Sequence, residues 1–167
     1  MTQPARPPRT RSRHGRKAED VSELDKRIIE HLQSDGRRPF TQIALDLGVS
    51  EAAVRARTSR LMERGILQIV GVTDPLKLGF HQMAMIGIRC ESSKLIAVAE
   101  HLATMPEVDY VVITAGSYDL LIETVCEDNE ALLAFLAERL RAIDGVRDTE
   151  TFVYLRLVKQ TYQYGTR

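Results

Sequence analysis

The stretch GVSEAAVRARTSRL, residues 48–61, predicts a tight turn followed by an amphipathic helix. Gly48 suits the bend, and Ser50 is a residue type that caps the amino terminus of helices. Val54, Thr58 and Leu61 recur at helical spacing and fall on one side of that helix. The other sides carry alanines in the first turn and then arginines and a serine. The stretch therefore predicts a helix with one buried face and one exposed, basic face.

Two shorter helices are predicted on the amino-terminal side of this stretch. The first begins with the capping-box pattern of Ser22 and Asp25, and we expect it to end at Gly36 in the left-handed conformation. The second begins at Thr41. Apolar residues at helical spacing give both helices a core face: Leu24, Ile28 and Leu32 in the first, and Ile43, Ala44 and Leu47 in the second.

The basic helix is expected to run to about Arg64 and to end at Gly65. Residues 66–72, ILQIVGV, alternate between apolar and other residues as a strand does. Three short helices followed by a strand are typical of a helix-turn-helix with a winged extension.

A helix-turn-helix places its last helix in the major groove of double-stranded DNA, which assigns a role to each exposed residue. The alanines leave room for close approach, and Arg55 is long enough to reach base edges, where arginine pairs with guanine. Arg57 and Arg60 flank the exposed face and suit the two phosphate walls of the groove. The predicted DNA-binding residues are Ser50, Glu51, Ala52, Ala53, Arg55, Arg57, Ser59 and Arg60. The alternative is an amphipathic helix whose basic face is only solvated.

Charge is distributed unevenly, although the formal net charge of the chain is zero. Residues 1–70 contain 14 Lys and Arg against 9 Asp and Glu, whereas residues 71–167 contain 9 against 14. This asymmetry indicates one half that faces nucleic acid and one half with another task, the alternative being chance unevenness. Residues 1–20 hold six Lys and Arg, three Pro and no Val, Leu or Ile, so we expect a disordered basic arm. That arm either follows DNA phosphates or is only solvated.

The sequence carries no motif for catalysis, for a metal or for a cofactor. Its four histidines are scattered, and no nucleophile elbow or phosphate loop is present. Cys90 and Cys126 each lie in an apolar run, so neither a disulfide nor a zinc site is predicted. No apolar run reaches the roughly 18 residues of a membrane span, and the first residues lack the apolar block of a secretory signal. We therefore expect a cytoplasmic protein without a membrane partner.

The second half of the chain predicts an α+β fold. Strand-like runs occupy residues 83–90, 108–115, 118–126 and 151–158. Two amphipathic helices lie between them, one with Leu95, Val98, Ala99 and Leu102 on its apolar face and one with Leu133, Leu136, Leu140 and Ile143. The resulting order is βαββαβ, the ferredoxin-like arrangement.

An internal repeat supports this arrangement. LATMPEV at 102–108 matches LRAIDGV at 140–146, an offset of 38 residues. The repeat pairs Leu102 with Leu140, Met105 with Ile143 and Val108 with Val146. Each copy ends a helix and leads into a strand, as two βαβ halves require.

The predicted strands are apolar on both faces. In residues 83–90, Ala84, Ile86 and Ile88 fall on one face, and Met83, Met85 and Gly87 on the other. Two helices cover only one face of a four-stranded sheet, so we predict that a second copy of the chain covers the other face in a homodimer. An apolar face left exposed is the alternative, but large exposed apolar patches are uncommon in monomers.

Residues 22–160 resemble the Lrp/AsnC (feast-or-famine) transcription regulators. The resemblance rests on LDKRIIEHLQSDGR at 24–37, IALDLGVS at 43–50, VRARTSRLMERGIL at 54–67 and AGSYDLLIE at 115–123. It implies an amino-terminal winged helix-turn-helix, a linking strand and a ferredoxin-like ligand domain, in homodimers that often assemble further, commonly as octamers. It also implies a small effector, often an amino acid, bound near Gly116, Ser117, Tyr118 and Asp119. A plain hairpin turn is the other reading of this loop, in which Gly116 suits a positive φ.

The predicted organisation assigns a task to each range. Residues 1–20 are the basic arm, 21–66 the DNA-binding domain, 67–80 a linker strand and hinge, 81–160 the ligand-binding and oligomerisation domain, and 161–167 a tail.

Three other functions compete with a DNA-binding regulator. An enzyme lacks support from any motif. An RNA-binding module of the same strand order would need aromatic stacking strands, whereas the central strands offer only Tyr110 and Tyr118. An amino-acid sensor that regulates a partner protein without binding DNA is the remaining alternative.

Overall fold

The computed structural model describes residues 21–161, so the predicted basic arm and all but the first residue of the tail lie outside the described residues. Contacts divide the chain after Val70 into an amino-terminal unit and a carboxy-terminal unit, Gly71–Gln160. The two units are described separately below.

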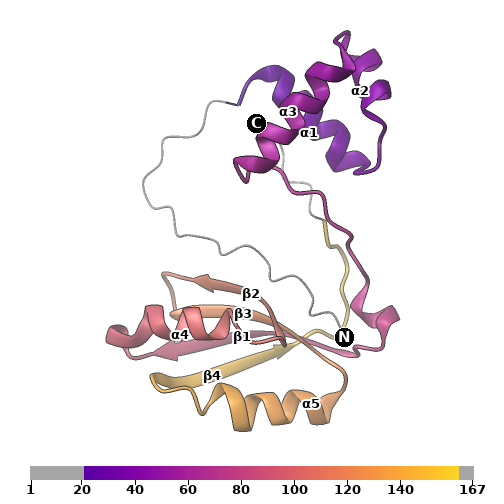
Figure 1. The fold of residues 1–167 in the computed structure, drawn as a ribbon. Coiled ribbons are helices and arrows are strands. Elements are labelled where there is room, and N and C mark those ends of the chain that lie inside the picture. The colour runs from indigo at the N-terminus through magenta and orange to yellow at the C-terminus, as the bar shows by residue number, and fades with distance from the viewer. Residues whose placement is uncertain (1–20, 162–167) are drawn as a thin grey trace, which may run out of the picture. The chain divides into compact units, whose positions relative to one another are not determined.

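The amino-terminal unit holds three helices, α1 (Glu23–Ser34), α2 (Phe40–Leu47) and α3 (Glu51–Glu63), as Figure 1 shows. The Ser22 and Asp25 capping box is confirmed. Each helix contributes apolar side chains to one core: Ile28, Ile29 and Leu32 from α1, Ile43 and Ala44 from α2, and Val54 and Leu61 from α3. The helix-turn-helix prediction is therefore confirmed.

The turns agree with the predictions at two glycines and differ at one. Gly48 and Gly65 adopt the left-handed conformation, with φ of 67° and 69°. Gly36 does not, because α1 ends at Ser34 and Asp35 turns the chain in an extended conformation, its N–H donating to the His31 carbonyl. The prediction for Gly36 was therefore wrong.

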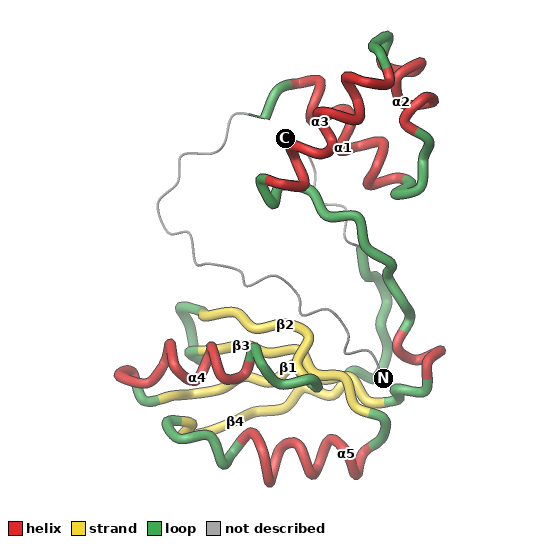
Figure 2. The backbone as a smooth tube through the Cα atoms, in the orientation of Figure 1, coloured by secondary structure: helices red, strands yellow, loops and turns green. Residues whose placement is uncertain are grey.

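Residues 66–72 do not form the predicted strand (Figure 2). The N–H groups of Ile66 and Leu67 donate to the Leu61 carbonyl, so the segment starts as a cap of α3, and Leu67 packs into the core. Beyond it Ile69, Val70 and Val72 are exposed. The alternation has the composition of a strand, but a strand needs a hydrogen-bonded neighbour, and residues 21–161 supply none to this segment. A 3-10 turn, Pro75–Leu78, follows.

The carboxy-terminal unit has the predicted βαββαβ order. Its elements are β1 (Gln82–Cys90), α4 (Leu95–Leu102), β2 (Val108–Ile113), β3 (Leu120–Cys126), α5 (Asn129–Ala134), a π-helix (Phe135–Leu140) and β4 (Val146–Val153). The strands form one antiparallel sheet in the order β2-β3-β1-β4. The two central strands are thus the first strand of each βαβ half.

Both helices pack on one face of the sheet. Ala84, Ile86 and Ile88 of β1 are fully buried on that face, as predicted, and lie in one core with Val98 and Leu102 of α4 and Phe135 and Leu140 of the second helix. The opposite face of the sheet, which we call the open face, has no helix of this unit packed on it.

The 38-residue repeat is confirmed in atomic detail. The Met105 N–H donates to the Leu102 carbonyl and the Ile143 N–H to the Leu140 carbonyl. At the next step Val108 donates to Met105 and Val146 donates to Ile143. The two halves therefore leave their helices through the same hydrogen-bonded turn.

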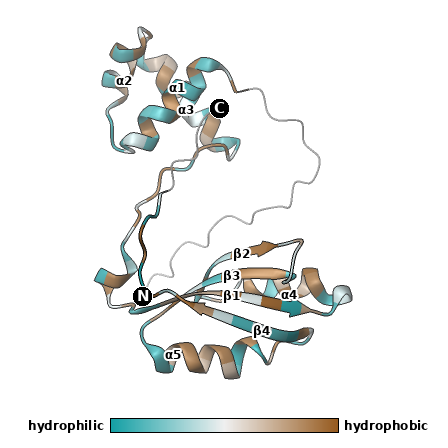
Figure 3. Cartoon of the chain, turned by 180° about the vertical axis from the view of Figure 1, so that it is seen from behind, coloured by the Kyte–Doolittle hydropathy of each residue, from teal (hydrophilic) through white to brown (hydrophobic). Residues whose placement is uncertain are grey.

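The bounds of the last strand and one core residue of the second helix were predicted wrongly. The last strand was expected at residues 151–158 but is β4, Val146–Val153, whose first half is polar (Figure 3). It is an edge strand, so its residues meet solvent and do not follow the apolar alternation. Leu133, predicted to be apolar core, is 61% exposed, whereas Leu132 and Phe135 are buried. The π-helix that follows adds a residue to the turn, which shifts the buried face away from 3.6-residue spacing.

Candidate DNA-binding surface and effector loop

The exposed face of α3 is the one predicted from its sequence. Arg55, Ser59 and Arg60 are exposed, while Val54, Thr58 and Leu61 are buried. The Ser50 side chain accepts a hydrogen bond from the Ala53 N–H at 3.2 Å. This cap leaves other N–H groups of the first turn free to face an anion, and the helix dipole adds positive potential there.

Arg55 is held in place before any DNA is bound. Its Nη2 donates to Glu51 Oε1 at 2.6 Å, and its guanidinium carbon lies 5.3 Å from the centre of the Phe40 ring. A guanidinium and a carboxylate therefore lie side by side on the exposed face of α3. These groups match the acceptors of guanine and the amino donor of cytosine, respectively. Phe40 was missed from the sequence, because it belongs to another helix and the periodicity of α3 cannot reveal it.

Arg57, predicted to lie on a flank of α3 and to contact phosphate, is half-buried and is bonded to the start of α1. Its Nη1 donates to Asp25 Oδ1 at 2.9 Å and to Ser22 Oγ at 3.2 Å, both at the start of α1. Asp25 is only 7% exposed. Burial opposes ionisation of this carboxyl, but hydrogen bonds from Ser22 and Arg57 outweigh it and lower the pKa of Asp25. The Arg57 side chain thus connects α3 to α1 in the structure, and its contact with phosphate stays a prediction.

The loop between β2 and β3 is closed by Asp119. Its carboxylate Oδ2 accepts the Cys90 N–H at 2.8 Å, and its own N–H donates to the Ile88 carbonyl at 2.9 Å. Thr114 donates through its hydroxyl to the Tyr118 carbonyl. The predicted positive φ of Gly116 is wrong, and a Cβ there would meet no heavy atom within 4 Å. The loop is thus a hydrogen-bonded turn with an exposed tip at Gly116 and Ser117.

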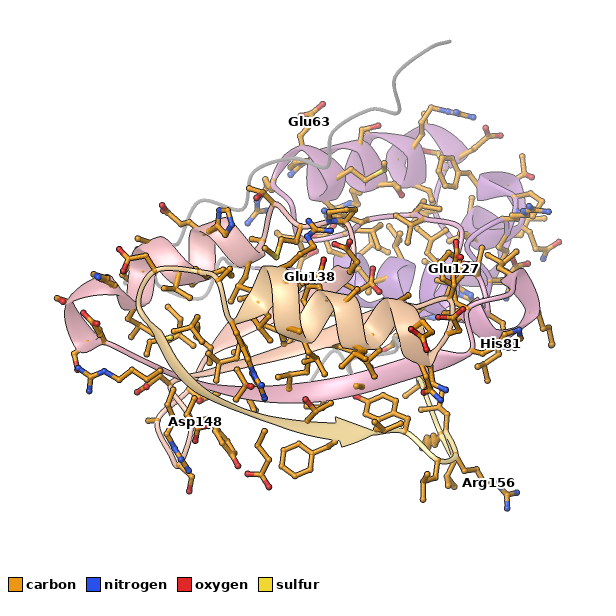
Figure 4. The ribbon with its side chains drawn as sticks, turned by 90° about the horizontal axis from the view of Figure 1, so that it is seen from below. Glu63, His81, Glu127, Glu138, Asp148 and Arg156 are labelled. Atoms are coloured by element: carbon orange, nitrogen blue, oxygen red, sulfur yellow. The ribbon has the colours of Figure 1, made fainter. Side chains whose placement is uncertain are left out.

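The Tyr118 ring lies over β1. A Cβ added to Gly87 would come within 2.6 Å of the ring, so glycine is required there. Arg89 stacks on the same ring at 5.2 Å and donates through Nε to the Ser117 carbonyl, while its Nη1 pairs with Asp148 at 2.9 Å. Figure 4 shows Asp148 at the end of the sheet remote from His81 and Arg156. Arg89 was missed from the sequence, because an arginine within an apolar strand gives no sign of its partners.

The open face is apolar with acidic and phenolic groups near its centre. Met85 lies opposite Glu123 on β3 and Phe152 on β4. Burial raises the pKa of Tyr154 to about 12, aided by its hydrogen bond with Glu123. Burial also raises the pKa of Asp109, and the Glu123 charge adds to the effect. Both shifts favour the protonated, uncharged forms of Tyr154 and Asp109 beside Glu123.

Residues 21–161 contain neither a metal centre nor a membrane span. No group of three or more potential metal ligands occurs among them. No helix in this range is long and apolar enough to cross a membrane.

Two family models match the chain on either side of the division between its units. The AsnC-type helix-turn-helix domain matches residues 21–62, and the Lrp/AsnC ligand binding domain matches residues 83–164. The chain belongs to the Lrp/AsnC family. The resemblance found in the sequence is thereby confirmed: this is a transcriptional regulator with a helix-turn-helix and a ligand-binding domain, and its relatives are regulators, not enzymes.

Similar proteins support the assignment to the Lrp/AsnC family along most of the chain. An uncharacterised HTH-type transcriptional regulator of Pyrococcus abyssi is 35% identical over 89% of this chain and 94% of its own length. The structure of E. coli AsnC is similar with a TM-score of 0.77 and 26% identity, covering 84% of this chain and 95% of AsnC. A Neisseria meningitidis regulator in complex with L-Met has the same fold, with a TM-score of 0.78 and 22% identity over 86% of this chain and 95% of that one.

Proposed function

We propose that this Lrp/AsnC regulator binds double-stranded DNA as a homodimer, with the α3 helix of each copy in the major groove. The observation that carries the proposal is the exposed face of α3, where Arg55 is already oriented by Glu51 and Phe40. Arg55 and Glu51 read base edges, while Arg60 and the α3 amino terminus at Ser50 contact phosphates. Ala52, Ala53 and Ser59 complete the surface. A regulator of this kind acts where the DNA is, in the cytoplasm.

The homodimer forms through the open face of the sheet. This face carries Met85, Tyr110 and Phe152, and both Tyr110 and Phe152 are substantially exposed in the single chain. A second copy buries all of them at once and gives two α3 helices the two-fold relation that a palindromic site requires. Dimers assemble further into higher oligomers, with an octamer as the form implied by the family.

The DNA-binding surface is tested by two arginine variants. Arg55→Ala should weaken binding to duplexes selected by the parent from a random pool by about 1–3 kcal/mol, and should relax preference at one base pair. Arg60→Ala should weaken binding to all sequences alike and reduce the slope of log K against log salt by about 0.9. Both are measured by fluorescence anisotropy.

An arginine on the other unit provides the control. Arg147 is an exposed residue of β4, and Arg147→Ala should bind DNA as the parent does. If both α3 variants also bind like the parent, α3 is not the DNA-reading helix.

We further propose that an amino acid binds at the loop of Gly116, Ser117, Tyr118 and Asp119 and shifts the assembly of the protein. Support comes from the family assignment and from the related structure determined with L-Met. The exposed tip of the loop offers the Ser117 hydroxyl and the Gly116 backbone, and the Asp119 carboxylate supplies charge for an ammonium group. The other copies of the chain in the oligomer complete the site.

The effector site is tested by thermal shift with each proteinogenic amino acid, followed by light scattering. A ligand at a hundred times its Kd stabilises the folded protein by about 2.7 kcal/mol. Asp119→Asn should abolish this stabilisation. It preserves the acceptor for the Cys90 N–H, so the melting temperature without ligand should change little. A retained shift in this variant would place the amino acid elsewhere.

A further inference from the structure

A shallow cavity lies between the end of the π-helix and the start of β4. Its volume is about 370 Å³, and its lining residues are Arg141, Val146, Arg147, Asp148 and Thr149. The first of these directly follows the π-helix, and the other four begin β4. Because β4 is an edge strand, its outer edge has no neighbouring strand within residues 21–161, and the cavity is open to a ligand.

The cavity carries two guanidinium groups that no carboxylate neutralises. Arg141 donates through Nε to the Thr149 hydroxyl at a long 3.4 Å. Arg147 makes no side-chain hydrogen bond or ion pair in the part of the chain that the structure describes. Both side chains are exposed, so each can turn toward a ligand without first giving up an ion pair.

The one acidic residue of the lining is already engaged. Asp148 Oδ2 accepts from Arg89 Nη1 at 2.9 Å, and its Oδ1 accepts the Thr149 N–H at 2.9 Å. The charge of Asp148 is therefore balanced by Arg89 and does not offset the two lining arginines. The cavity is left with a net positive charge, which favours an anionic ligand.

The cavity lies beside the proposed effector loop. The guanidinium of Arg89 donates through Nε to the Ser117 carbonyl at 3.0 Å and through Nη1 to Asp148 at 2.9 Å. A single planar group thus contacts the loop with one nitrogen and the lining of the cavity with another. A small molecule held at the loop has the two unpaired arginines as its neighbours.

We propose that this cavity binds the side-chain carboxylate of the effector, which is therefore an acidic amino acid, L-aspartate or L-glutamate. The inference rests on the proposed amino-acid site at the loop of residues 116–119. Arg141 and Arg147 hold the carboxylate, since the planar fork of arginine matches its two oxygens, and the Thr149 hydroxyl donates to it. The amides L-asparagine and L-glutamine have nearly the same shape but leave both guanidinium groups without an anionic partner.

Isothermal titration calorimetry on the full chain tests the choice of ligand. L-Aspartate and L-glutamate are compared with L-asparagine and L-glutamine at constant pH and ionic strength. One acidic amino acid should bind at least tenfold more tightly than its own amide. Sodium phosphate, an anion without the amino-acid groups, should bind at least tenfold more weakly than that amino acid. Phosphate that binds as tightly would overturn the inference, because the cavity would then be a general oxyanion site.

Substitution of the two arginines tests the place of binding. Arg141→Gln and Arg147→Gln should each weaken binding of the acidic amino acid about five- to tenfold, and should reduce the preference for it over its amide by the same factor. The matched control is Arg156→Gln, at an exposed arginine that lies at the end of the sheet remote from Asp148 (Figure 4). The control should bind both ligands as the parent does. Equal melting temperatures without ligand show that each variant is folded.

The outcomes separate this inference from the proposed effector function. If a neutral amino acid binds more tightly than both acidic ones, the inference is overturned and the proposed effector function stands. The inference is also overturned if Arg141→Gln and Arg147→Gln both bind the acidic amino acid as the parent does. If no amino acid binds the parent, the proposed effector function fails and the inference fails with it.

Discussion

Replacing Met85 with aspartate should convert the proposed dimer to monomers. Met85 lies at the centre of the open face, directly opposite Glu123 and Phe152. A second carboxylate beside Glu123 repels it and would be buried without a partner in the dimer, and either effect costs several kcal/mol. Since about 1.4 kcal/mol is a tenfold change, we expect the dimer Kd to rise by about a hundredfold or more. Sedimentation velocity over a concentration series measures it.

The matched control introduces the same charge on the helix side of the unit. Ala97 is an exposed residue of α4, so Ala97→Asp should leave the dimer Kd unchanged. If Met85→Asp remains dimeric at the concentrations where the parent is dimeric, the open face is not the interface.

Gly87→Val should destabilise the carboxy-terminal unit by about 3 kcal/mol, near the upper end of the usual cost of overpacking. The first added carbon alone would come within 2.6 Å of the Tyr118 ring, so the ring must leave β1. The same movement breaks its stacking with Arg89 and its edge-on packing against Phe152. Urea denaturation at a concentration that keeps the protein assembled measures the free energy of unfolding.

A second background shows whether the ring is the cause. In Tyr118→Ala the space above Gly87 is empty, so adding Gly87→Val should then cost much less, and the two changes should be clearly non-additive. Gly71→Val is the control for a valine in place of glycine, because a Cβ at Gly71 meets nothing within 4 Å and its φ is not positive. If Gly87→Val lowers the free energy of unfolding equally in the parent and in Tyr118→Ala, the clash with the Tyr118 ring is not the cause of the destabilisation.

Elements set by local rules could be predicted from the sequence. The Ser22 and Ser50 caps, the bend at Gly48, the helix end at Gly65 and the buried side of α3 agree with the predictions. Each of them depends on residues within a turn or two of each other. The βαββαβ order followed from the apolar runs and helical spacing, and the repeat supported it, since two similar halves have to form similar structures.

Features that depend on distant contacts could not be predicted. Arg57 has the spacing of a surface residue, yet Asp25, 32 residues earlier, draws it to α1. Leu133 has the spacing of a core residue, yet the π-helix that follows rotates it outward. In the two candidate sites, Phe40 contacts Arg55 of another helix and Arg89 contacts Tyr118 of the loop after β2. Periodicity within a single element cannot reveal such partners.

The 38-residue repeat gives the sheet an approximate internal symmetry. Met85 and Glu123 are equivalent in the repeat and also face each other across β1 and β3, so a pseudo-two-fold axis perpendicular to the sheet passes between them. A second copy packed on the open face and rotated by half a turn about this axis would meet nearly the same backbone. The two orientations then differ only in the contacts made by side chains that are not the same in the two halves. Met85 and Glu123 are such a pair, and they lie at the axis itself. In the proposed dimer, we therefore expect Glu123 to select a single orientation at some cost in stability.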